Sequence, residues 1–179
     1  AMTPTFKSRH YDLAVDTITE ADLSELIEWL RAFPRLTMAH VTREFEEAWS
    51  RWLGVRYSVF CNSGSSADLL MYAALDSLGR SRNRRVVVPA VGWSTTVAPA
   101  MQFGWQPFMC EAEPQRFCLD PEQLEEILRR ERPDNVILVH VLGTPADMDA
   151  LLALQQKYGF NLLEDCCAAH GACFRGRKV

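Results

Sequence analysis

The stretch of sequence that decides the fold reads RYSVFCNSGSSADLL and runs from Arg56 to Leu70. Its first five residues are largely apolar and aromatic, and they predict a short buried strand. The small polar residues that follow predict a tight turn. Apolar residues then recur at helical spacing from Ala67 onward. The stretch therefore predicts a strand, a turn and a helix that begins near Ser65.

The start of this helix is a candidate anion site. Backbone N–H groups in the first turn of a helix have no intrahelical partner, and the helix dipole is positive there. Gly64 lets the backbone approach a ligand closely, and the hydroxyls of Ser63, Ser65 and Ser66 add donors. The alternative is that the serines only cap the helix. This turn alone supports both interpretations equally.

Composition excludes several classes of protein. The chain has 179 residues, 48% of them hydrophobic, which is enough to bury a substantial core. A net charge of −4 argues against nucleic acid as a main partner. No apolar run approaches the roughly 20 residues of a membrane span, and no secretory signal pattern begins the sequence. We therefore expect no membrane partner. The six cysteines lack zinc-type spacing, so we expect no metal site and reduced thiols in a cytoplasmic protein.

Strands and helices alternate along most of the chain. Residues 1–55 are expected to form an N-terminal helical segment with two amphipathic helices, and residues 56–179 an α/β domain. Further strands are predicted at 86–88, 107–110, 136–141 and 160–163, and helices at 94–103, 120–128 and 146–158. Repeated βα units with apolar strands predict a mainly parallel sheet covered by helices on both faces, a three-layer α/β fold.

The ends of these strands carry the chemistry. In open α/β sheets, ligands bind beyond the carboxyl ends of the strands. Three such ends supply the anion cup at residues 62–66, the flat ring of Trp93 and the carboxylate of Asp165. A phosphorylated pyridine needs a phosphate seat, a stacking partner and a carboxylate at its ring nitrogen. The placement of these groups therefore predicts pyridoxal phosphate as the cofactor.

Each of these residues also has a purely structural interpretation. Trp93 can pack in the core, and Asp165 can cap a helix; for both residues the two interpretations have equal support. For His170 and His140 a packed, hydrogen-bonded role is favoured over a catalytic one.

The same residues resemble the DegT/DnrJ/EryC1/StrS family of sugar aminotransferases, which are pyridoxal-phosphate enzymes of the aspartate aminotransferase fold type I. The resemblance runs from about Tyr11 to Val179. It is most specific in NSGSSA at 62–67, VPAVGWSTT at 88–96, HVLGTPADM at 140–148 and LED at 163–165. The WSTT version is similar to the branch of 3-dehydrases that act on nucleotide-linked 4-keto-6-deoxyhexoses.

The resemblance implies a role for several residues. Gly64, Ser65 and Ser66 would bind the cofactor phosphate, Trp93 would stack on the ring, and Asp165 would hold the pyridine nitrogen. Position 168, also beside the cofactor, departs from the family, because Ala168 stands where members usually carry Gln, or Glu or Asp in the dehydrase branch.

A second departure concerns the catalytic base. The Schiff-base lysine of the family, or the histidine that replaces it in dehydrases, is expected beyond Val179, and none of Lys7, Lys157 and Lys178 matches its position. We therefore expect a truncated large domain, without the small C-terminal domain, that is inactive alone.

Two hypotheses for function follow. The resemblance implies that the full-length protein uses pyridoxal or pyridoxamine phosphate for 3-dehydration or transamination of a nucleotide-linked keto-deoxysugar, in polysaccharide, O-antigen or antibiotic sugar biosynthesis. The resemblance also implies that the full-length protein is a homodimer, because in the family the active site forms between subunits. The alternative is a non-catalytic module that binds the cofactor or a nucleotide sugar, or a dimerisation half. Ala168 and the missing lysine favour this alternative, whereas Trp93 and Asp165 favour the enzyme.

Overall fold

The computed structural model describes residues 15–179. They belong to two compact units, one ending at Val41 and the other beginning at Thr42. Helix α1 (Glu20–Arg31) belongs to the first unit. Thr19 and Asp22 form a reciprocal capping box at its start, which explains why the helix begins there. The division expected from the sequence, after residue 55, stays a prediction for the full-length protein.

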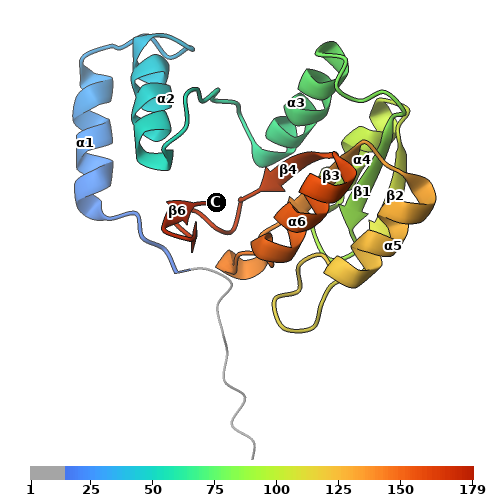
Figure 1. The fold of residues 1–179 in the computed structure, drawn as a ribbon. Coiled ribbons are helices and arrows are strands. Elements are labelled where there is room, and N and C mark those ends of the chain that lie inside the picture. Colours follow the sequence, from blue (N-terminus) through green and yellow to red (C-terminus); the bar gives the residue numbers. More distant parts are fainter. Residues whose placement is uncertain (1–14) are drawn as a thin grey trace, which may run out of the picture. The chain divides into compact units, whose positions relative to one another are not determined.

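The second unit is built on a parallel four-stranded sheet (Figure 1). Its strands are β1 (Arg85–Pro89), β2 (Gln106–Cys110), β3 (Asn135–Val139) and β4 (Asn161–Asp165). The spatial order is β2-β1-β3-β4, and every neighbouring pair is parallel. The three consecutive valines of β1 and all five residues of β3 are buried, as expected for strands covered on both faces.

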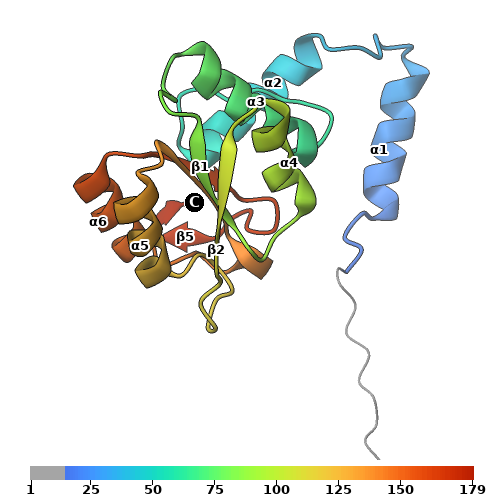
Figure 2. The same cartoon turned by 90° about the vertical axis from the view of Figure 1, so that its right-hand side faces the viewer.

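Helices cover both faces of this sheet (Figure 2). Helices α3 (Gly64–Ser77) and α4 (Ser94–Gln102) pack on one face, where Tyr72 and Ala100 meet Val86 and Val88. Helices α5 (Pro121–Glu131) and α6 (Met148–Tyr158) pack on the other, where Leu124 and Leu151 join the core. The three-layer α/β fold predicted from the sequence is confirmed.

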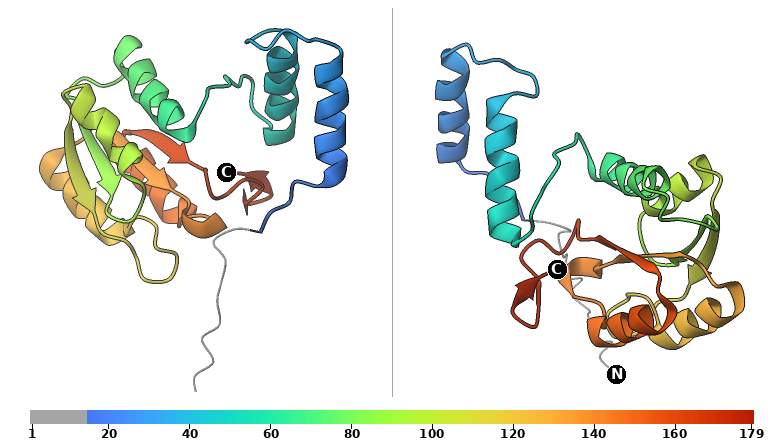
Figure 3. Two further views of the ribbon diagram at one scale, coloured as in Figure 1. Left: turned by 180° about the vertical axis from the view of Figure 1, so that it is seen from behind. Right: turned by 45° about the horizontal axis from the view of Figure 1, so that its top comes forward.

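One prediction was wrong. Residues 56–60 do not form a strand, although the chain there is extended (Figure 3). Tyr57 and Val59 are exposed, and the backbone N–H of Phe60 donates to Oε1 of Glu46 at 2.8 Å. Glu46 lies on helix α2 (His40–Leu53), so a side chain supplies the hydrogen bond that a neighbouring strand would have given. An apolar run can form a β-strand only when the backbone of a neighbouring strand hydrogen-bonds to it.

Smaller differences lie at the ends of elements. The strand expected over 136–141 ends at Val139, and a short 3₁₀ turn, η1 (Val141–Gly143), follows it. The strand expected at 160–163 is not the last, because the hairpin β5 (Cys173–Phe174) and β6 (Arg177–Lys178) comes after β4. All six cysteines are free thiols. Among residues 15–179 no helix has the length and apolar character needed to cross a membrane.

Candidate functional site

The N-terminus of α3 is open toward solvent. Ser63 caps the helix, because its Oγ accepts a hydrogen bond from the amide of Ser66 at 3.1 Å. Within the described chain, the amides of Gly64 and Ser65 have no hydrogen-bond partner. A Cβ added to Gly64 would meet no atom within 4 Å. Two N–H donors without a partner in the described chain therefore belong to exposed residues at the positive end of the helix dipole, an arrangement that suits a phosphate.

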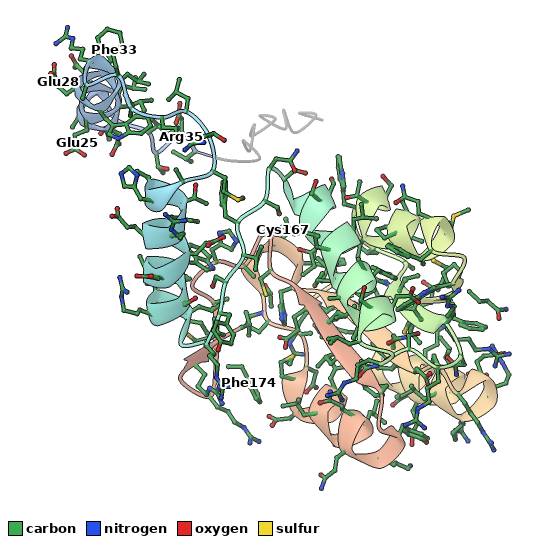
Figure 4. The ribbon with its side chains drawn as sticks, turned by 90° about the horizontal axis from the view of Figure 1, so that it is seen from above. Glu25, Glu28, Phe33, Arg35, Cys167 and Phe174 are labelled. Carbon is green, nitrogen blue, oxygen red and sulfur yellow. The ribbon has the colours of Figure 1, made fainter. Side chains whose placement is uncertain are left out.

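A cavity of about 530 Å³ lies beside this helix end. Residues of α2, α3, β4 and the turn after β4 line it, and they include Gly64 and Trp49. Cys167, in that turn, is labelled in Figure 4, as is Phe174 in the hairpin beyond it. None of the described residues that line the cavity is a lysine or an arginine. Its ionisable side chains are those of Asp68, Glu164, Asp165, Cys166, Cys167 and His170.

Asp165 is held in place at the end of β4 by hydrogen bonds to both carboxylate oxygens. Its Oδ2 accepts from Oγ1 of Thr96 at 3.3 Å, and its Oδ1 accepts from the backbone N–H of Cys167 at 3.0 Å. Its backbone carbonyl accepts from the amide of His140 at 3.1 Å. Each carboxylate oxygen keeps a free lone pair, so the group can still accept a hydrogen bond from a ligand in the cavity.

A second carboxyl group lies close to Asp165. Asp68 is on α3, one helical turn after Gly64, and only 5% of it is exposed. Burial, and then the negative charge of Asp165, raise the pKa of Asp68 to about 7, although hydrogen bonding to Thr96 acts in the opposite direction. Burial and then the charge of Asp68 also raise the pKa of the Tyr72 hydroxyl, which donates to the carbonyl of Thr96 at 3.2 Å.

Glu164 points toward a fully buried histidine. His140 accepts a hydrogen bond at Nδ1 from the amide of Ala146 at 3.0 Å. Its Nε2 lies 3.1 Å from Oε2 of Glu164, so the ring proton sits on Nε2 and is donated to the carboxylate. The structural interpretation of His140 fits this arrangement, because both ring nitrogens serve to connect β3, the following turn and β4.

The thiols in the cavity are poor nucleophiles. Burial, followed by the charges of Glu164 and Asp165, raises the pKa of Cys166 to about 12. Burial and a hydrogen bond to Asp165 raise the pKa of Cys167 to about 11. Both sulfurs therefore stay protonated at neutral pH. Within residues 15–179, no group of three or more His, Cys, Asp or Glu side chains is arranged to hold a metal ion.

The structure brings some of the sequence-predicted residues together. Gly64 and Asp165 line the same cavity, whereas Ser65, Ser66, Trp93 and Ala168 are not among its lining residues. Trp93 precedes α4 and is 72% exposed. It follows β1 at the carboxyl edge of the sheet, the edge at which Asp165 ends β4. The roles given to these six residues stay predictions.

Two residues of the site were missed from the sequence. Thr96 lies one turn after Trp93, and Asp68 one turn after Gly64, so helical spacing from the predicted residues would have pointed to both. An aspartate in the otherwise apolar stretch after Ala67 was the available signal for Asp68.

Comparison with known proteins identifies the family. The family model described as the DegT/DnrJ/EryC1/StrS aminotransferase family matches residues 16–179. The chain belongs to this family. The resemblance in the sequence motifs is thereby confirmed over almost the same range.

Two individual members illustrate this similarity. The chain is 34% identical over 151 residues to the L-glutamine:2-deoxy-scyllo-inosose aminotransferase of Streptomyces lividus, covering 84% of this chain and 35% of that protein. It is 31% identical over 173 residues to the GDP-4-keto-6-deoxy-D-mannose 3-dehydratase of Yersinia pseudotuberculosis, covering 95% and 44%.

A solved structure extends the similarity to the fold. The Escherichia coli GDP-4-keto-6-deoxy-D-mannose-3-dehydratase with bound hydrated PLP superposes with a TM-score of 0.87 at 29% identity, over 95% of this chain and 44% of that one. The chain thus spans less than half the length of these three relatives. Its architecture is that of the pyridoxal-phosphate enzymes of fold type I.

Proposed function

We propose that the full-length protein uses pyridoxal or pyridoxamine phosphate to modify a keto group of a nucleotide-linked deoxysugar, by 3-dehydration or by transamination. The observation that carries the proposal is that Asp165 and the start of α3 share one cavity. A carboxylate and a phosphate-binding helix end are the two polar requirements of this cofactor. Relatives named as an aminotransferase and a 3-dehydratase support both forms of the reaction.

The residues present suit the cofactor. The free amides of Gly64 and Ser65 would bind its phosphate, and the space at Gly64 leaves room for that group. Asp165 would accept a hydrogen bond from the ring nitrogen and hold the proton there, while Thr96 and the Cys167 amide fix the orientation of its carboxylate. When bound, the cofactor supplies an electron sink for a carbanion at the carbon attached to its ring.

The lysines of the described chain have other partners. Nζ of Lys157 lies 2.6 Å from Oε1 of Glu125, and Nζ of Lys178 donates to the carbonyl of Trp52 at 2.8 Å. Neither lysine lines the cavity. Together with the family resemblance, these lysine contacts support the proposal that the proton-transferring lysine or histidine lies outside residues 15–179. If the full-length protein lacks it, the binding-module hypothesis replaces the enzyme.

We also propose that the full-length protein is a cytoplasmic homodimer. Exposed aromatic side chains on α2, among them Phe45 and Trp52, support a subunit contact there. Light scattering at micromolar concentration is expected to give twice the mass of one chain, and a monomer would contradict this part of the proposal.

The reaction can be tested on the full-length gene product. Titration with pyridoxal phosphate and with pyridoxamine phosphate is expected to show saturable binding by absorbance. Incubation with a nucleotide-linked 4-keto-6-deoxyhexose and glutamate then separates the two chemistries by mass spectrometry. Loss of the C3 hydroxyl indicates dehydration, and replacement of the keto oxygen by an amino group indicates transamination. Cofactor binding without turnover of any such sugar would favour the non-catalytic module instead.

A further inference from the structure

The cavity beside α3 has an excess of acidic groups. It contains the carboxyls of Asp68, Glu164 and Asp165, and none of the described residues lining it carries a permanent positive charge. Glu164 accepts a hydrogen bond from Nε2 of His140. Asp165 accepts hydrogen bonds from the Thr96 hydroxyl and from the amide of Cys167. Asp68 is more deeply buried than Asp165 and forms no ion pair within residues 15–179. The protein therefore has to neutralise one carboxyl, or keep two negative charges close together in a partly buried site.

We propose that Asp68 carries a proton while the cofactor is absent, and that it releases this proton when a protonated pyridine ring pairs with Asp165. The inference rests on the proposed function, because it assumes that the ring nitrogen docks at Asp165. Thr96 connects the two carboxyls, because its hydroxyl hydrogen-bonds with Oδ2 of Asp165 and with Asp68, and its single proton can be donated to only one of them at a time. A pyridinium N–H adds one positive charge beside Asp165, and that charge replaces the proton that Asp68 held. The proton passes to solvent, and no covalent bond changes.

Among the groups around the cavity, Asp68 is the one expected to hold and release the proton. Its pKa of about 7 makes it the carboxyl whose charge can change near neutral pH. On its own helix the hydroxyl of Tyr72 stays protonated, because burial and the charge of Asp68 raise the pKa of that group. The turn after β4 contributes the thiols of Cys166 and Cys167, whose raised pKa values keep them neutral as well. Among the described residues, the other ionisable side chains that line the cavity are those of Glu164, which accepts from His140, of Asp165 and of His170, whose ring centroid lies 5.3 Å from that of Trp49.

Calorimetry can count the proton. Pyridoxamine phosphate is titrated into the full-length gene product and into Asp68→Asn, in two buffers of different ionisation enthalpy, at pH 6 and at pH 8.5. At pH 6 the original protein is expected to release about one proton more than the variant on binding. At pH 8.5 Asp68 is already ionised, so the difference should vanish. Protons that the cofactor itself gains or loses cancel, because they are common to both proteins.

A matched control uses another aspartate of the same helix. Asp76 pairs with Arg84 at 3.0 Å and does not line the cavity, so Asp76→Asn should release as many protons as the original protein. Carbon-13 NMR of the cofactor-free protein adds a readout that needs no variant, because the Asp68 carboxyl signal should titrate near pH 7.

The outcomes separate this inference from the proposed function. Binding with equal proton counts in the original protein and Asp68→Asn at pH 6, or an Asp68 signal that titrates near pH 4, overturns the role of Asp68 and leaves the cofactor assignment standing. Absence of pyridoxamine phosphate binding in both proteins overturns the cofactor assignment and this inference with it.

Discussion

The two faces of the parallel sheet bury side chains of different character. The face covered by α5 and α6 is closed by aliphatic and aromatic groups, and its central members, Leu124, Leu151 and Leu138, are completely buried. On the face covered by α3 and α4, the core cluster is smaller, and the buried polar residues Asp68 and Thr96 lie on its helices. The indole Nε1 of Trp105 there is the one buried side-chain polar atom, among the described residues, that lacks a hydrogen-bond partner.

The two faces therefore contribute differently to the stability of the fold and to the chemistry of the site. Apolar burial on the α5–α6 face stabilises the fold without placing any reactive group. The α3–α4 face gives up part of that stabilisation, because buried carboxyl and hydroxyl groups cost free energy unless they are well paired. In return it brings a helix end, a hydroxyl and two carboxyls to the carboxyl edge of the sheet. Substitutions at the polar site on the α3–α4 side should therefore mainly change activity. Substitutions in the apolar core on the α5–α6 side should mainly change the free energy of unfolding.

The largest effect is expected at Asp165. Asp165→Asn keeps the shape of the side chain and the hydrogen bond from the Cys167 amide, and its Nδ2 can donate to the Thr96 hydroxyl, so the free energy of unfolding should change little. The amide cannot stabilise a positive charge on the ring nitrogen. Since removing one partner of a buried ion pair costs several kcal/mol, turnover of the sugar by the full-length protein should fall at least about 100-fold.

A capping aspartate provides the control for Asp165. Asp147 begins α6, where its side chain accepts from the amide of Ala150 at 3.1 Å, and it does not line the cavity. Asn and Asp are comparable caps, so Asp147→Asn should leave both turnover and stability close to those of the original protein. If Asp165→Asn behaves in the same way, Asp165 is only a structural cap and its role at the ring nitrogen is refuted.

On the α5–α6 face, a substitution is expected to change the free energy of unfolding. Leu151 is fully buried, and Leu151→Ala should lower the free energy of unfolding by about 2–5 kcal/mol, measured by urea denaturation. Its neighbour Leu152 is 40% exposed, so Leu152→Ala should change the same quantity by no more than about 0.5 kcal/mol. Equal effects of the two substitutions would show that Leu151 is no more buried than Leu152.

Much of this architecture could be predicted from the sequence because local signals agreed with tertiary packing. Local chemistry sets these elements: β-branched residues form β1, Asp120 and Pro121 begin α5, and Gly159 ends α6. The position of the carboxyl edge then follows from the parallel topology. The prediction of a strand at 56–60 was wrong because strand formation also needs a neighbouring strand, which the local sequence does not reveal.

The site was only partly predictable because it depends on contacts between distant parts of the chain. Thr96 and Asp165 are 69 positions apart, and no local pattern announces their hydrogen bond. The raised pKa of Asp68 depends on burial and on the charge of Asp165, both of which arise only after folding. The sequence indicates which residue types gather at the edge, and the folded chain determines which of them interact.

A smaller, pH-dependent effect is expected for Asp68. Because folding raises its pKa from 3.8 to about 7, this group contributes stability that is fully present below about pH 4 and is lost as pH rises through 7. Asp68→Asn removes the ionisation. At pH 8 the variant should be more stable than the original protein by up to about 4 kcal/mol, and the two should converge near pH 4. A stability difference that does not change between urea titrations at pH 4 and pH 8 would show that Asp68 ionises normally in the folded protein.

The smallest effect compares the caps of two helices on opposite faces. Ser63 caps α3 beside the cavity, and Asp120 caps α5, where it accepts from the amides of Glu122 and Gln123. Replacing either residue with alanine should lower the free energy of unfolding by about 1 kcal/mol, because each substitution leaves helix N–H groups unsatisfied. Only Ser63→Ala should also weaken binding of pyridoxamine phosphate, since it alters the helix end proposed to hold the phosphate. Equal cofactor affinities of Ser63→Ala and Asp120→Ala, measured by fluorescence titration, would mean that the serine-rich turn only caps its helix.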